Sequence, residues 1–240
     1  MFCLGYPDQA LERSRAAIVD ARRLAHPPTL AGSLAMGIRL HLLFEDSTAL
    51  GEGVDQLIAV TTEQGFPHWR ALETISRGWV HVKNGEIAAG MSLLRSGLAA
   101  SRTNGAWMPQ NIALLAGACE IAGQVEEALA LLDDALQIVE RTGERWFAAE
   151  LNRHKGRLLL RQGHSETAEE LYRKSLRIAD EQEAKLWELR AATSLARLWR
   201  QQGRQGGEAH ELLAPVYGSF TEGFDTTDLK EAAKLLSELA

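Results

Sequence analysis

The chain has 240 residues, a net charge of −6 and a hydrophobic fraction of 45%. The acidic balance argues against a general nucleic-acid binder, and two cysteines are too few for a disulfide framework or a zinc site. Helix-forming residues dominate while proline, β-branched and aromatic residues are sparse, so the composition predicts an all-helical protein.

The first predicted element is a helix over residues 8–24, which begins within the segment GYPDQAL at residues 5–11. This segment matches GQVEEAL at Gly123, a turn between two helices, so the first helix corresponds to the second member of a pair whose first member is missing. We therefore expect a fragment or natural truncation of a longer protein. Its uncovered apolar face would carry Leu4, Leu11 and Ile18 and favour self-association. The alternative is that the first helix is simply a cap.

Residues 26–44 and 48–64 are the next predicted helices, and a regular pattern follows them. Four tryptophans recur 38, 39 and 41 residues apart, and a glycine follows each one 16 or 17 positions later. The tryptophans are Trp69, Trp107, Trp146 and Trp187, and the glycines are Gly85, Gly123, Gly163 and Gly203. Glycine accepts the left-handed conformation that ends a helix, so each unit is a helix, a glycine turn and a second, antiparallel helix. Such pairs bury their apolar faces by stacking.

This pattern sets the remaining boundaries. Tryptophan-led helices are expected over 67–83, 107–121, 144–161 and 184–201, and glycine-led helices over 86–102, 124–141 and 164–181. A last helix over 225–239, with Asp225, Thr226 or Thr227 as its N-cap, closes the stack. The prediction is one repeat domain over residues 1–240 with roughly 11–12 helices. Its units are about 1–25, 26–65, 66–103, 104–142, 143–182 and 183–240.

The spacing of small residues resembles the tetratricopeptide repeat (TPR). Its pattern of small residue, turn glycine and alanine occurs at Gly156, Gly163 and Ala168, at Gly78, Gly85 and Ala89, and at Ala196, Gly203 and Ala209. The unit of about 40 residues is longer than the usual 34. Longer units of this kind resemble the C-terminal regions of bacterial class III adenylate or guanylate cyclase–ATPase proteins and of maltose-regulator-type transcription activators. The phrase LLAPVYGSFTEGFDTTDLKEA especially resembles the cyclase-associated version.

The resemblance implies a right-handed α-solenoid of antiparallel helix pairs. The tryptophan-led helices would be inner helices that line a concave face, and the glycine-led helices would be outer ones. It also implies a regulatory module for signal transduction, which binds a peptide, a protein or the catalytic modules of its own parent chain. The alternative is a stand-alone TPR-type receptor for a peptide or small ligand.

The sequence contains no recognisable motif for catalysis, metal binding or phosphate binding. Its seven histidines are scattered, with no pair at the i, i+4 spacing of a helical metal site. The segment GEGVD at residues 51–55 lacks the lysine and hydroxyl residue of a phosphate-binding loop. We expect no enzymatic activity, no cofactor and no metal. We expect a cytoplasmic location, because no apolar run approaches the roughly 20 residues of a membrane span and no signal peptide is evident.

Charge is the one feature that indicates a binding site. The inner helices over 144–161 and 184–201 carry an excess of cations, whereas the outer helices over 124–141 and 164–181 carry an excess of carboxylates. A concave wall concentrates such charge, and arginine suits the bidentate capture of carboxylates, so an acidic peptide is the expected ligand. The candidate binding residues are Glu150, Arg153, Arg157, Arg161, Arg190, Thr193, Arg197 and Arg200. The alternative is that inner and outer helices attract each other within the stack.

Apolar and aromatic residues at the repeat positions favour packing. Leu72, Ile75, Trp79 and Val82 occupy the matching groove positions of an earlier unit. We expect them to pack between helices, and an apolar peptide-binding patch is the weaker alternative. The four unit-initial tryptophans should likewise fill the wedges between neighbouring pairs, because aromatic residues recur there at a fixed phase. An aromatic ladder for a ligand is the other interpretation.

Overall fold

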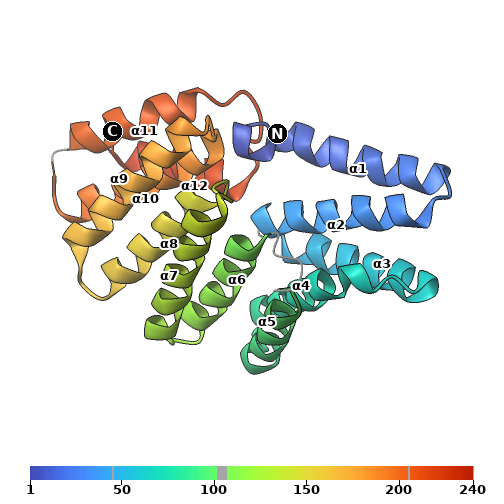
Figure 1. The fold of residues 1–240 in the computed structure, drawn as a ribbon. Coiled ribbons are helices and arrows are strands. Elements are labelled where there is room, and N and C mark those ends of the chain that lie inside the picture. The colour runs from blue at the N-terminus through green and yellow to red at the C-terminus, as the bar shows by residue number, and fades with distance from the viewer. Residues whose placement is uncertain (45, 102–106, 205, 240) are drawn as a thin grey trace. The chain divides into compact units, whose positions relative to one another are not determined.

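The computed structural model describes residues 1–44, 46–101, 107–204 and 206–239 (Figure 1). Within these ranges the chain forms twelve α-helices, two short 3₁₀ turns (Phe2–Leu4 and Pro67–Trp69) and no strand, which confirms the predicted all-α class. The helices are α1 (Pro7–Arg23), α2 (Pro27–Phe44), α3 (Ser47–Gln64), α4 (Arg70–Lys83), α5 (Ile87–Ser101), α6 (Met108–Ile121), α7 (Val125–Thr142), α8 (Ala148–Arg161), α9 (Ser165–Glu181), α10 (Lys185–Gln201), α11 (Gly206–Gly218) and α12 (Thr227–Leu239). None of the described helices is both long and apolar enough to cross a membrane.

The chain divides into two compact units. Unit 1 comprises Met1–Gln9 and Leu132–Ala240, and unit 2 comprises Ala10–Leu131. The predicted end of the helix over 86–102 and the predicted unit boundary at 103–104 lie outside the described residues.

Inner and outer helices alternate in both units, as the repeat pattern predicts. In unit 2, α4 contacts both α2 and α6, and in unit 1, α10 contacts both α8 and α12. The outer helix α9 packs against α8 and α10. The four turn glycines have positive φ values: Gly85 (89°), Gly123 (78°), Gly163 (88°) and Gly203 (68°). These values confirm the predicted helix ends, since side chains with a Cβ rarely adopt this backbone region.

One helix pair of unit 2, α4 and α5, packs backbone against backbone. Helices α4 and α5 approach so closely that a Cβ added at Gly90 would lie 2.6 Å from the Gly78 carbonyl oxygen, and one added at Gly97 would lie 3.0 Å from the Ile75 nitrogen. Gly90 is buried whereas Ala89 is exposed. The predicted assignment of Ala89 to the small position of this repeat is therefore wrong. Gly90, which lies one residue later, takes that position because only hydrogen fits between the two helices.

The inner-face residues of α4 pack as predicted. Leu72, Ile75 and Val82 are buried, and Trp79 packs partly against the core formed by α2 and α3. Ile18 of α1 also packs partly against this core. The expected exposed apolar face of Leu4, Leu11 and Ile18 is therefore wrong in part, because Leu4 is exposed and the other two are half-buried.

All four tryptophan-led helices begin later than predicted: α4 at Arg70 and not at 67, α6 at Met108 and not at 107, α8 at Ala148 and not at 144, and α10 at Lys185 and not at 184. Trp69 lies in the 3₁₀ turn before α4, Trp107 has φ 65° and precedes α6, and Trp146 precedes α8. Before α8, the Thr142 hydroxyl accepts a hydrogen bond from the Glu144 amide, so a local turn replaces the first helical turn expected there. Only Trp187 lies within its helix, α10.

The N-terminal residues of unit 1 dock onto its C-terminal helices. Phe2 is buried and packs edge-on against Trp187 with ring centroids 6.3 Å apart. Asp8 Oδ2 accepts a hydrogen bond from the Gly223 amide at 2.9 Å, and the Gln9 amide donates to Glu222 at 3.0 Å. These contacts join residues at least 185 positions apart, which no local sequence pattern predicts.

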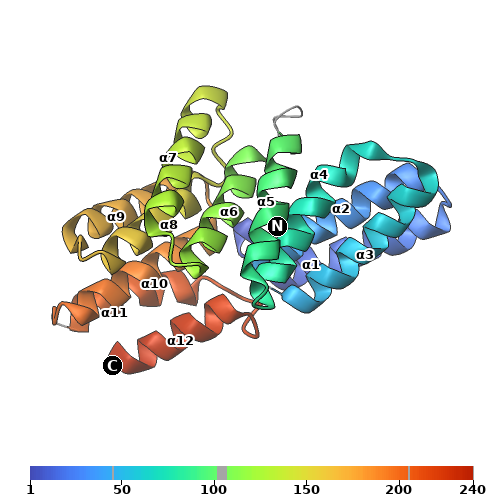
Figure 2. The same cartoon turned by 90° about the horizontal axis from the view of Figure 1, so that it is seen from below.

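Two C-terminal helices complete unit 1. Helix α11 was not assigned from the sequence, because Gly206 at its start and Pro215 within it are poor helix residues. Burial of Ala209, Leu213 and Val216 stabilises it nonetheless. Helix α12 begins where predicted, and Thr226 among the three candidates is its N-cap, since its hydroxyl accepts from the Leu229 amide at 3.4 Å. Helix α12 runs beside α10 (Figure 2).

Candidate interaction surface

Unit 1 has three inner helices, α8, α10 and α12. All eight sequence-predicted site residues lie on α8 and α10. The structure separates the eight into three groups. Glu150, Arg153, Arg190 and Thr193 are buried or nearly so; Arg157 and Arg161 are exposed and interact within the chain; Arg197 and Arg200 are exposed and pair with α12.

A buried ionic network links the three inner helices. Arg153 donates twice to the Glu150 carboxylate, at 2.7 and 2.9 Å, and Arg190 Nη1 donates to the same carboxylate at 3.1 Å. Arg190 also binds Asp228 of α12 through its Nε and Nη2, at 2.7 and 2.9 Å. The Glu150 and Arg190 side chains are only 6% and 11% exposed. The charges of Glu150, Arg153 and Arg190 are therefore paired within the fold, and these side chains present little surface to a partner.

The ionised form of Glu150 is strongly favoured over the protonated form. Burial alone would raise the Glu150 pKa, but Arg153 and Arg190 outweigh this effect and lower the pKa to about 2. The carboxylate is therefore ionised throughout the physiological range and binds two guanidinium groups, one from its own helix and one from α10. Paired and hydrogen-bonded in this way, the network joins α8 to α10 and α10 to α12.

Trp187 fills the wedge between repeats beside this network. It is fully buried, its Nε1 donates to the Trp146 carbonyl at 3.2 Å, and Phe147 packs edge-on against it at 5.6 Å. The Arg190 guanidinium lies 5.2 Å from the centre of its ring. The packing role predicted for the tryptophans is confirmed for Trp187, whereas Trp69, Trp107 and Trp146 are only half-buried.

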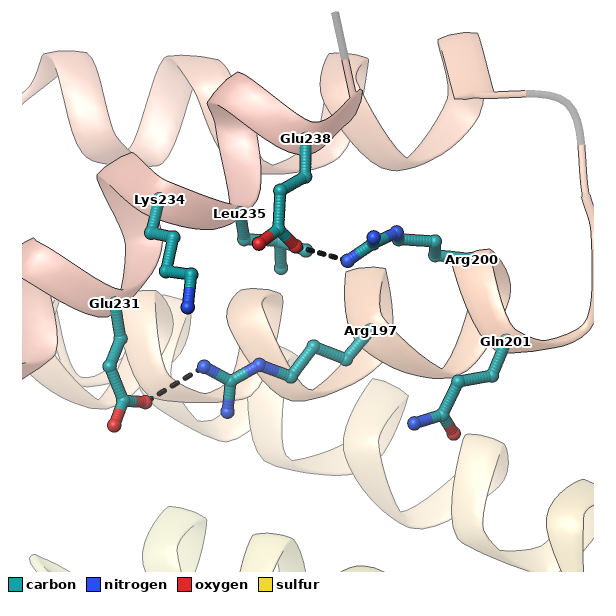
Figure 3. A pocket seen from close by; sticks show the side chains of 7 residues that line it. All are labelled: Arg197, Arg200, Gln201, Glu231, Lys234, Leu235 and Glu238. Carbon is teal, nitrogen blue, oxygen red and sulfur yellow. Dashed lines mark hydrogen bonds and ion pairs between the residues drawn. The ribbon is translucent and has the colours of Figure 1, made fainter.

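Arg197 and Arg200 border a groove of about 430 Å³ between α10 and α12 (Figure 3). Arg197 Nη2 donates to Glu231 Oε2 at 2.9 Å, and Arg200 pairs with Glu238. The groove is lined by Arg197, Arg200, Gln201, Glu231, Lys234, Leu235 and Glu238. Thr193 lies one turn before Arg197, is buried, and its Oγ1 has no hydrogen-bond partner within the described part of the chain.

The acidic residues of α12 were missed from the sequence. The sequence predicts only that the last helix closes the stack, although this helix starts 40 positions after Trp187 and therefore falls in the phase of an inner helix. Had that phase been applied, it would have placed the carboxylates of Asp228, Glu231 and Glu238 beside α10.

Attraction between neighbouring inner and outer helices also accounts for part of the charge pattern. Lys155 of α8 pairs with Asp133 of α7, and Arg204, just after α10, pairs with Glu169 of α9. Attraction between inner and outer helices, the alternative to a binding role, therefore explains the positions of some of the cations. It does not explain those of Arg197 and Arg200, whose partners lie on another inner helix.

A second hollow, of about 540 Å³, lies near the starts of α8 and α10. Trp146 and Trp187 form part of its wall together with Leu4 and Cys3 of the N-terminal turn. Burial raises the pKa of the Cys3 thiol to about 11, so the thiol stays protonated at neutral pH and is a poor nucleophile.

Comparisons with known proteins agree with this architecture. A family model for the tetratricopeptide repeat matches residues 110–181, which span most of α6 and all of α7–α9. A comparison with curated proteins finds no match. With its alternating inner and outer helices, the chain has an all-α, TPR-like repeat fold.

Several solved structures share this fold. NprR in complex with its cognate peptide NprX is similar with a TM-score of 0.68 and 14% identity, over 92% of this chain and 63% of that one. The apo form of RapI has a TM-score of 0.61 and 11% identity, over 97% and 70%. BtubC from P. vanneervenii has a TM-score of 0.57 and 17% identity, over 98% and 83%. At these identities the likeness concerns the fold alone.

Proposed function

We propose that this chain is a non-catalytic interaction module that binds a protein or peptide through the inner helices of unit 1. The observation that carries the proposal is the groove between α10 and α12, where Arg197 and Arg200 are exposed on an inner helix. Guanidinium groups on one helix face can form bidentate hydrogen bonds with carboxylates, so an acidic peptide is the proposed partner. The fold of NprR, which its structure shows with a bound peptide, supports a peptide as the class of ligand.

The biological setting is part of the same proposal. The sequence resemblance favours a regulatory region of a bacterial cyclase–ATPase or transcription activator, located in the cytoplasm, whose partner could be the catalytic modules of its own parent chain. The likeness to NprR favours instead a stand-alone peptide receptor. Coding sequence for an ATPase module next to this segment in the genome supports the first setting, and its absence supports the second.

A peptide array tests the function itself. The full chain is incubated with immobilised acidic, neutral and basic peptides, alongside the variant Arg157→Glu plus Arg197→Glu. We expect acidic peptides to bind the natural chain and to lose most of their signal with the variant. The matched control is Lys174→Glu plus Arg177→Glu, which makes the same charge change on exposed positions of the outer helix α9 and should bind normally. No binding to any peptide class would contradict the proposed function.

A further inference from the structure

The two ends of the contact between α10 and α12 are built differently. At the first end, the side chains of Arg190 and Asp228 are only 11% and 20% exposed and are joined by two hydrogen bonds of 2.7 and 2.9 Å. At the other end, the side chains of Arg197 and Glu231 are 48% and 51% exposed, and those of Arg200 and Glu238 are 49% and 35% exposed. Water screens the second end, so its ion pairs hold the helices together only weakly.

The groove at this exposed end carries more positive than negative charge. Its walls hold three cations, Arg197, Arg200 and Lys234, and two carboxylates, Glu231 and Glu238. Within the described ranges Lys234 forms no ion pair, and Figure 3 shows its side chain between the two carboxylates. The walls therefore retain one net positive charge while both arginines are occupied.

The carboxylates can leave these arginines without moving α12. Leu229, Ala232 and Leu235 are buried and anchor the helix, as does the pairing of Asp228 with Arg190. Glu231 and Glu238, by contrast, are exposed side chains whose rotation breaks only a screened ion pair. A ligand carboxylate can then take the same positions on the guanidinium groups, which are already oriented for this chemistry.

We propose that the groove between α10 and α12 binds a peptide segment rich in glutamate or aspartate, and that Glu231 and Glu238 are built-in competitors for its arginines. The inference rests on the proposed function and names the residues that regulate it. Both competitors are carboxylates. A ligand that replaces them on the same arginines should therefore also carry carboxylates. They lie seven residues apart on one helix, about 10 Å, so two ligand carboxylates at a similar separation match the site.

Fluorescence anisotropy with a fluorescein-labelled hexaglutamate peptide tests the inference. The natural chain should bind the probe, and Glu231→Gln plus Glu238→Gln should tighten binding about fivefold, because two weak internal ion pairs no longer compete. Arg197→Gln plus Arg200→Gln should weaken binding at least about tenfold. The control Glu166→Gln plus Glu170→Gln removes the same charge from exposed positions of α9 and should leave affinity within about twofold.

The outcomes separate this inference from the function. If the groove variant and the α9 control tighten binding equally, general attraction explains the effect and the inference is overturned. If the array detects only neutral or basic peptides and hexaglutamate does not bind, the inference falls while the interaction function stands. Circular dichroism melting curves of all the variants confirm that each one is folded.

Discussion

Two kinds of helix contact are seen in the two units. In unit 2, α4 and α5 meet backbone to backbone at Gly78 and Gly90, where a Cβ would lie within 3 Å of the opposite main chain. In unit 1, the inner helices are joined by large side chains: Trp187 fills the wedge and the Glu150–Arg190–Asp228 network spans three helices. The close glycine contacts leave no room for long side chains between α4 and α5. Between α10 and α12, by contrast, long side chains border the groove of the candidate interaction surface.

Loss of the buried network should have the largest effect on stability. Arg190→Met leaves Asp228 without its bidentate partner and Glu150 with only one guanidinium. Because both carboxylates are largely buried, we expect the free energy of unfolding to fall by about 4 kcal/mol. Urea denaturation followed by circular dichroism measures this loss. A change below about 1 kcal/mol would show that the network is not what joins the inner helices.

Acid should weaken unit 1 through Glu150. Its pKa is lowered from 4.5 to about 2, so the ionised form is favoured by folding, and this stabilisation is fully present above pH 4.5. As the pH falls from about 4.5 towards 2, we expect a loss of about 3 kcal/mol from this group. Unfolding measurements across this range on the natural chain and on Glu150→Gln isolate the effect, because the variant lacks this pH-dependent part. Identical pH profiles would contradict the assignment.

A smaller effect is expected from filling the glycine contact of unit 2. In Gly90→Ala the new methyl group would meet the Gly78 carbonyl oxygen and the Val82 nitrogen, so the helices must separate. We expect a loss of about 2 kcal/mol. The adjacent variant Ala89→Ser serves as the control, because Ala89 is exposed and should tolerate the change within about 0.5 kcal/mol. If thermal melts showed equal losses of stability for the two variants, Ala89 and not Gly90 would be assigned to the small position of the repeat.

The smallest effect on stability should come from the groove itself. Arg197→Gln breaks an exposed ion pair with Glu231, and we expect the free energy of unfolding to change by less than about 1 kcal/mol. Arg190→Met, measured under the same conditions, provides the contrast between a screened and a buried arginine. If the two variants were equally destabilised, the distinction between the two ends of the α10–α12 contact would be lost.

Local sequence patterns were sufficient to predict the alternation of helices through α10, although α11 was not assigned. The glycine turns are positions where the backbone itself requires a residue type, and Thr226 caps α12 through a hydrogen bond three residues away. These features depend on neighbours in the sequence. The phase of tryptophan and glycine therefore carried enough information to assign inner and outer helices as far as α10.

Features that depend on distant neighbours could not be predicted in this way. The docking of Phe2 on Trp187 and the pairing of Arg190 with Asp228 join separate helices. Charge on α8 and α10 indicated a groove, but the same charges are partly neutralised by α12, whose role as an inner helix was overlooked. The choice of Gly90 over Ala89 likewise depends on how closely α5 approaches α4.

The most direct test of the account is nuclear magnetic resonance mapping of the hexaglutamate peptide on the isotope-labelled full chain. The account predicts that amide shifts cluster at residues 197–201 of α10 and 231–238 of α12, with little change at Arg190 in the buried network. Shifts concentrated in α4–α6, or spread evenly over the exposed cations of α9, would contradict it.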